Sequence, residues 1–198
     1  NKEARYWACL ALAEMGAAAK DAVPNLKNVL ADERPQVRLQ AVIALAEIGP
    51  ASRPAMLDLV KLLGDKFDAV RDAAVFALGR IGDKSATDAL LKADKADNPH
   101  LHGLVVWAVA KANPEDKQRQ REALELLATR LGGKDRDAAH LAAKNIADLE
   151  PTADVIRPVM EKLVAGADAE TAERIFNALA SLGARVVPLA IDALKDAS

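Results

Sequence analysis

The stretch Val37-Arg-Leu-Gln-Ala-Val-Ile-Ala-Leu-Ala-Glu-Ile-Gly49 decides the fold of this chain. Its apolar residues recur at helical spacing, so they fall on one face of a helix that ends at the glycine. A similar stretch, Val70–Gly82, lies 33 residues further along the chain. A third, Arg5–Gly16, ends 33 residues before Gly49. A repeat of this period is the signature of a helical array, so we predict an all-α solenoid.

Three looser copies follow at residues 101–113, 138–150 and 171–183, and their closing positions are spaced by 31, 37 and 33 residues. We name the helix of each copy the B helix, which gives six B helices. Glycine closes four of them, as expected where a helix ends in the left-handed conformation. Asn113 can adopt that conformation as well, whereas Glu150, followed by Pro151, is expected to end its helix by a different route.

Shorter apolar runs lie between the B helices, and we interpret them as A helices. They are Leu26–Leu30, Leu57–Leu63, Ala89–Leu91, Leu124–Leu131, Val159–Val164 and Leu189–Leu194. Pro24, Pro54, Pro158 and Pro188 are predicted to precede or open four of them. The fourth A helix is expected to be longer, over residues 116–131, with Pro114 at its first helical position.

The chain order is therefore one B helix, five A–B pairs and a final A helix. We predict a single domain over residues 1–198, with about five full repeats and a half repeat at each end. Neither end carries the polar face of a capping repeat, because Trp7 and Leu10 lie in the first helix and Leu189 in the last. We therefore expect the chain to be a fragment of a longer solenoid.

The composition supports packed helices and excludes several functions. Apolar residues make up 51% of the 198 residues, aromatic residues only 3%, and the formal net charge is −2. Such a charge provides no global field that would gather nucleic acid or an anionic membrane. No apolar stretch is long enough to span a bilayer, so we expect a soluble protein, with the cytoplasm favoured. The single cysteine, Cys9, is interpreted as a small core residue.

The pattern Val-Arg-x-x-Ala-x-x-Ala-Leu-x-x-Ile-Gly, present at Val37–Gly49 and at Val70–Gly82, resembles the short HEAT-like repeat of bacterial phycobilin lyases and many scaffold proteins. The resemblance implies a right-handed superhelix of antiparallel helix pairs, in which the B helices line the concave side. It also implies a structural ladder between neighbouring repeats, formed by the turn aspartates and the B-helix arginines. The matching residues are Asp32, Arg38, Asp65 and Arg71.

Equivalent positions of the B helices form columns on the expected concave side. The column six residues before each closing position begins with Leu10, Ile43, Phe76 and Trp107, which either form an exposed apolar stripe or pack between neighbouring helices. The column two residues before it changes from acidic, at Glu14 and Glu47, to basic. The predicted partner-binding residues are Trp7, Leu10, Gln40, Ile43, Phe76, Arg80, Trp107, Lys111, Lys144 and Arg174.

Signs of catalysis or metal binding are weak in the sequence. His100, His102 and His140 do not form a recurring His–Glu pair, and no phosphate-binding loop or nucleophile elbow is present. We therefore predict a protein that is not an enzyme, binds no cofactor or metal, and uses the concave face to bind a protein or peptide. Two alternatives remain open: an accessory role like that of the bilin lyases, and DNA binding of the alkylation-repair type.

Overall fold

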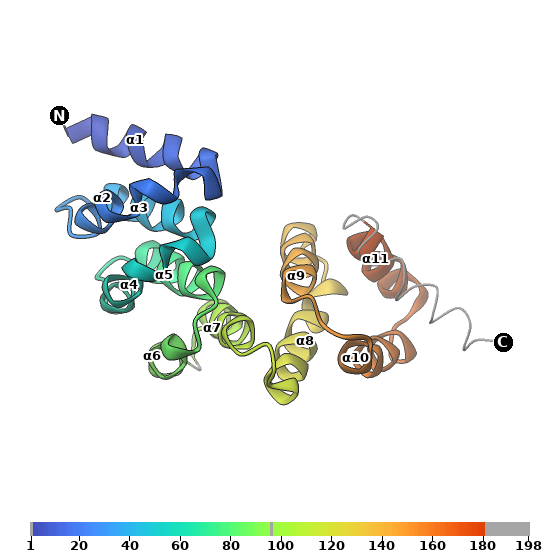
Figure 1. Cartoon of the computed structure of the whole chain (residues 1–198). Coiled ribbons are helices and arrows are strands. Elements are labelled where there is room, and N and C mark those ends of the chain that lie inside the picture. Colours follow the sequence, from blue (N-terminus) through green and yellow to red (C-terminus); the bar gives the residue numbers. More distant parts are fainter. Residues whose placement is uncertain (1, 96, 181–198) are drawn as a thin grey trace. The chain divides into compact units, whose positions relative to one another are not determined.

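The computed structural model describes residues 2–95 and 97–180, and every regular element there is helical (Figure 1). The chain divides into two compact units, Asn1–Asn113 and Pro114–Ser198, and each is described below by itself. The all-α solenoid predicted from the repeat is confirmed. The prediction that residues 1–198 form one domain stays a prediction.

The first unit contains four B helices of equal length. They are α1 (Lys2–Met15), α3 (Pro35–Ile48), α5 (Asp68–Ile81) and α7 (Pro99–Ala112). Each packs against the next, α1 on α3, α3 on α5 and α5 on α7, so that they form one layer. The A helices α2 (Val23–Val29), α4 (Met56–Leu62) and α6 (Thr87–Ala93) pack on α3, α5 and α7 and form a second layer (Figure 1).

Alanine and medium-sized aliphatic residues fill the space between these layers. Ala41, Ala44 and Leu45 of α3 are fully buried, as are their counterparts Ala74, Ala77 and Leu78 of α5. Small alanine side chains let neighbouring helices approach closely, while the leucines fill the space towards the A helices. The repeated sequence therefore builds the same packed unit at each step.

Short 3-10 segments lead from the B helices into the A helices. These are η1 (Gly16–Ala22), η2 (Gly49–Ala55) and η3 (Lys84–Ala86). Gly16, Gly49 and Gly82, which close the B helices, have φ values of 53°, 73° and 68°. Only glycine adopts such angles without a steric cost from Cβ, which explains its recurrence every 33 residues. Pro24 lies in the first turn of α2, and Pro54 lies in η2, just before α4.

Two B helices end without glycine, at Asn113 and Glu150, and both ends differ from expectation. Asn113 has φ −129°, so it is not left-handed; its side-chain amide instead donates to the carbonyl oxygen of Val109, at 2.8 Å, and to the Thr87 hydroxyl, at 2.8 Å. Glu150 has φ 50° and ψ 49°, so it ends the helix α9 (Arg136–Leu149) as a glycine would. The expectation that Glu150 uses a different route is therefore wrong.

Replacing Glu150 by glycine is expected to stabilise the second unit by about 1 kcal/mol, because the left-handed conformation costs an L-residue that much or more. Thermal unfolding should shift upward by roughly 2–4 °C. Asn113→Gly is the matched control. It should destabilise the protein, because Asn113 is not left-handed and its amide satisfies the end of α7. Equal shifts for both variants would contradict this account.

The second unit contains α8 (Lys117–Leu131), α9 (Arg136–Leu149), α10 (Ala153–Ala165) and α11 (Ala169–Ala180). Helix α8 is longer than the earlier A helices, as predicted, but it begins after Asp116, whose carboxylate accepts from the Arg119 N–H at 3.1 Å. Pro114 therefore does not open it. Pro158 lies inside α10 and does not open it either. Pro188 and the final A helix, Leu189–Leu194, lie outside the described residues.

Candidate partner-binding surface

The B helices of the first unit expose one side, which we call the B-face. Along α3, Gln36 and Glu47 are exposed while Gln40 and Ile43 are half-buried, and these positions repeat at helical spacing on one side. The opposite side of α3, at Leu45, is fully buried. The equivalent positions of the other B helices are Glu3, Trp7, Leu10 and Glu14 in α1, Ala69, Ala73, Phe76 and Arg80 in α5, and His100, Leu104, Trp107 and Lys111 in α7.

Apolar side chains run along the middle of the B-face. Trp7 is 61% exposed, and Leu10, Ile43, Phe76 and Leu104 are half-buried. Each of these residues comes from a B helix, and together they span all four helices of the layer. Half-buried apolar side chains with polar neighbours on both sides are typical of interaction surfaces.

Trp107 is not part of the accessible surface, which corrects its prediction as a partner-binding residue. Its side chain is 1% exposed and stacks on Phe76, with ring centroids 5.2 Å apart and ring planes 15° apart. The reason is Gly79 on the neighbouring helix. A Cβ atom there would lie 2.5 Å from Cζ3 of Trp107, so the absence of a side chain is what gives the indole its place between the helices.

A charged row lies at the end of the B helices where each approaches its closing residue. Glu14 and Glu47 are exposed, and Arg80 and Lys111 are half-buried. Arg80 lies 4.0 Å from the Glu47 carboxylate and donates through Nε to the Ala46 carbonyl oxygen at 3.4 Å. The row is therefore acidic over α1 and α3 and basic over α5 and α7.

The opposite edge of the B-face carries His100 on α7 and Glu3 on α1. His100 lies 3.6 Å from the Asp72 carboxylate. Burial raises the pKa of Asp72 above its usual value, and the charge of His100 partly opposes that rise. Glu3, on α1, is exposed at the same edge.

A cavity of about 340 Å³ lies beside Trp7, lined by Glu3, Tyr6, Trp7, Arg34, Gln36 and Val37. The rings of Tyr6 and Trp7 meet edge to face, with centroids 5.3 Å apart. Arg34 lies 3.5 Å from Asp32, a carboxylate that it shares with Arg5. The cavity therefore combines an exposed aromatic face with the carboxylate of Glu3.

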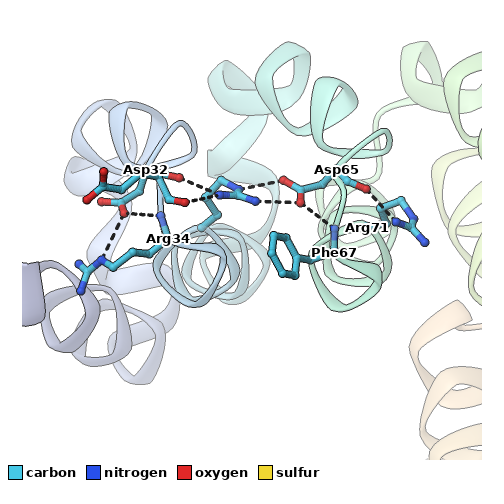
Figure 2. Close-up of polar contacts among 7 residues, drawn as sticks. Asp32, Arg34, Asp65, Phe67 and Arg71 are labelled. Atoms are coloured by element: carbon cyan, nitrogen blue, oxygen red, sulfur yellow. Dashed lines mark hydrogen bonds and ion pairs between the residues drawn. The ribbon is translucent and has the colours of Figure 1, made fainter.

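A ladder of aspartate and arginine side chains links neighbouring repeats (Figure 2). Arg38 forms two hydrogen bonds of 2.8 Å with the Asp65 carboxylate, and its Nη1 donates to the Asp32 carbonyl oxygen at 2.8 Å. Asp65 also accepts from the Phe67 N–H at 3.0 Å, which satisfies a donor at the start of α5. The Arg38 guanidinium lies 5.8 Å from the centre of the Phe67 ring, within cation–π range.

The same pattern extends to both sides of this contact. Arg5 donates to Asp32 at 2.6 Å, and Asp32 accepts from the Arg34 N–H at 3.0 Å. Arg71 donates to the Asp65 carbonyl oxygen at 2.7 Å and contacts the Asp68 carboxylate. The hydrogen bonds lower the pKa of Asp32 and Asp65, against the opposing effect of burial. The Arg5–Asp32 and Arg38–Asp65 contacts connect neighbouring repeats, whereas these contacts of Arg71 lie within its own repeat.

The last two predicted binding residues belong to the second unit. Lys144 of α9 is exposed. Arg174 of α11 is half-buried and bound within its own unit, donating to the Gly132 carbonyl oxygen at 3.2 Å, to Glu170 at 2.6 Å and to Thr171 at 2.7 Å. The bonds of Arg174 connect the end of α8 with α11. Contact of Arg174 with a partner stays a prediction.

The histidines have separate surroundings. His102 contacts Asp94 at 2.9 Å, His100 faces Asp72, and His140 is exposed on α9. Within residues 2–95 and 97–180, no three His, Cys, Asp or Glu side chains converge as metal ligands would. In the same part of the chain, no helix has the length and apolar character needed to cross a membrane.

Two layers of antiparallel helices, built by a repeated sequence and exposing a mixed apolar and charged face, define an α-solenoid repeat protein. The family model for HEAT repeats matches residues 1–61 and 56–147. The chain therefore belongs to the HEAT repeat family, as its sequence pattern predicts. Among curated proteins, no relative matches this sequence.

Solved structures of similar fold include natural and engineered repeat proteins. The complex of CpcE and CpcF of phycocyanin lyase from Nostoc matches with a TM-score of 0.55 and 21% identity, covering 90% of this chain and 88% of that one. An engineered protein matches with a TM-score of 0.54 and 22% identity over 91% and 92% of the two chains. A designed armadillo repeat protein in complex with the peptide (KR)4 has a TM-score of 0.51 and 22% identity, over 88% and 91%. At these identities the similarity shows the fold alone.

Proposed function

We propose that this protein is a binding module without catalytic activity, and that the B-face of its first unit holds a protein or peptide partner. The observation that carries the proposal is the exposed apolar band across four adjacent B helices. Trp7 is its most exposed member, and tryptophan is enriched among the residues that dominate binding energy.

The architecture supports this role. The B helices are fixed by buried alanines and by the aspartate–arginine ladder, so the B-face is held rigid before a partner arrives. A designed repeat protein of the same fold is in complex with a peptide, which offers a precedent for peptide binding. No specific observation in the described residues favours the bilin-lyase or DNA-binding alternatives.

The test uses peptides that are selected from a displayed random library for binding to the full chain. Trp7→Ser and Leu10→Ser are expected to weaken binding of the selected peptides about tenfold each, measured by isothermal titration calorimetry, because each removes an apolar contact of the B-face. Leu57→Ser is the matched control, since Leu57 is 70% exposed but lies on the A helix α4. Peptides that lose affinity with Leu57→Ser, or with none of the three variants, would show that the B-face is not the binding surface.

A further inference from the structure

The B-face differs chemically between its two ends. Over α1 and α3 it carries the exposed carboxylates of Glu14 and Glu47, and over α5 and α7 the cationic groups of Arg80 and Lys111. The apolar side chains of Leu10, Ile43 and Phe76 connect these ends. We propose that the B-face binds a peptide segment of defined charge order, with a lysine or arginine over α1, apolar residues over α3 and α5, and a carboxylate over α7. This inference rests on the function proposed above.

The α1 end is suited to a cationic side chain. Trp7 is 61% exposed, so its ring can lie against an ammonium or guanidinium group, and cation–π contacts favour tryptophan. Glu3 lines the cavity beside Trp7, and Glu14 lies about three turns further along the same helix. The Arg34 guanidinium in the cavity wall lies 3.5 Å from Asp32, a carboxylate that it shares with Arg5. A cation on the Trp7 ring therefore meets an aromatic face and the carboxylate of Glu3, while Glu14 adds negative charge further along α1.

The α7 end is suited to a carboxylate. Arg80 and Lys111 lie at equivalent positions of adjacent helices, so their charges act on the same part of the B-face. Arg80 lies 4.0 Å from the Glu47 carboxylate of α3, at the border between the acidic and basic parts of the row, and Lys111 extends the basic part onto α7. At the other edge, the Asp72 carboxylate lies 3.6 Å from His100, and the row of Arg80 and Lys111 supplies the cationic groups of this end.

The length of the B-face determines how long the bound peptide is and whether the charges at its two ends act independently. Adjacent packed helices lie about 8–10 Å apart, so the span from α1 to α7 is roughly 30 Å. An extended chain covers this with about ten residues. Glu14 on α1 and Lys111 on α7 are therefore separated by about three Debye lengths of roughly 8 Å at physiological salt, so each selects its own charge. A segment bound in reverse would place like charges together at both ends, giving an orientation preference on the order of tenfold.

A photo-crosslinking experiment on the full chain tests this inference. The probe is a peptide of about 12 residues, with two lysines at one end, alternating leucines in the centre and two glutamates at the other end. A benzophenone side chain is placed beside either the lysines or the glutamates. A second probe has the same residues in the opposite chain order. We expect the lysine-end label to react with α1 and α3, and the glutamate-end label with α5 and α7, with about tenfold preference that falls at high salt.

The matched variant carries Glu14→Lys, Glu47→Lys, Arg80→Glu and Lys111→Glu, and it should invert the crosslinking pattern. Glu14→Lys alone, at an exposed position, should reduce the end preference about threefold. This single variant replaces the quadruple variant in the test if the latter does not fold. Equal reaction of both labels along the B-face would overturn the charge-order inference and leave the proposed function standing. Reaction outside the B-face, or none with any probe, would overturn the proposed function itself.

Discussion

Replacing Gly79 by alanine is expected to destabilise the first unit by about 2 kcal/mol. Alanine ordinarily stabilises a helix by roughly 1 kcal/mol relative to glycine, so the helix propensity works in its favour. The new Cβ, however, would lie 2.5 Å from Cζ3 of Trp107 and 3.0 Å from Cα of Ala108. Because the second of these atoms is backbone, both the indole and the helix α7 must move. Overpacking of this kind costs about 1–3 kcal/mol and outweighs the gain in propensity.

Thermal and urea denaturation of the full chain would measure this effect. Gly64→Ala is the control, because a Cβ there meets only the Lys61 carbonyl oxygen at an ordinary 3.6 Å. The double variant Gly79→Ala/Trp107→Leu should be less destabilised than the two single changes predict, because leucine no longer occupies the space beside Gly79. Additive effects in the double variant, or equal effects of the two glycine substitutions, would show that the Gly79–Trp107 contact is not the cause.

Replacing Asp65 by alanine is expected to cost about 2 kcal/mol, because the Asp65 carboxylate holds three donors at once. It accepts two hydrogen bonds from Arg38 and one from the Phe67 N–H. Its side chain is only 7% exposed and that of Arg38 13%, so removing the carboxylate leaves a nearly buried cation without its partner. Asp58→Ala is the control, since Asp58 pairs with Lys27 and Lys61 at the surface and should contribute less than 1 kcal/mol.

The contact between Asp65 and Arg38 makes the stability of the fold depend on pH. The hydrogen bonds from Arg38 hold the pKa of Asp65 below its usual value. A lowered pKa in the folded state means that the stabilisation is complete above the unfolded value, about 3.9, and is lost as the pH falls through the folded value. The stability difference between wild type and Asp65→Asn should therefore be constant from pH 7 to about pH 5 and shrink in more acidic solution. A difference that grows on acidification would contradict the assigned role of Asp65.

The sequence predicts the fold because the repeat specifies it at several levels. The spacing of Val37, Ala41 and Leu45 predicts the buried side of a B helix, and Gly49 predicts its end; both features are present in the structure. The resemblance implies that Asp65 and Arg38 take part in a ladder between repeats, and the structure adds that Arg38 bonds the carboxylate of the following turn. Local periodicity therefore identifies elements more readily than it identifies partners in contact.

The errors have physical causes that a single sequence conceals. Trp107 occupies the same column as Leu10, and its burial depends on Gly79, which replaces the alanine of the two preceding repeats. That substitution is the sequence feature by which the burial could have been predicted. Aligning the B helices at their closing residues would also have identified Glu3, Gln36 and Leu104 as members of the B-face. Glu150 gives no such indication, because a glutamate is rarely left-handed.

The different surroundings of the two tryptophans give the protein a pair of intrinsic optical reporters. The indole of Trp7, on the B-face, should emit at long wavelength and be quenched readily by iodide, whereas that of Trp107 is shielded among side chains of the helix layer. A ligand seated on the B-face should thus alter the Trp7 emission alone, and loss of the packed layer should alter that of Trp107. Occupancy and unfolding could be followed separately in one cuvette, without any added dye.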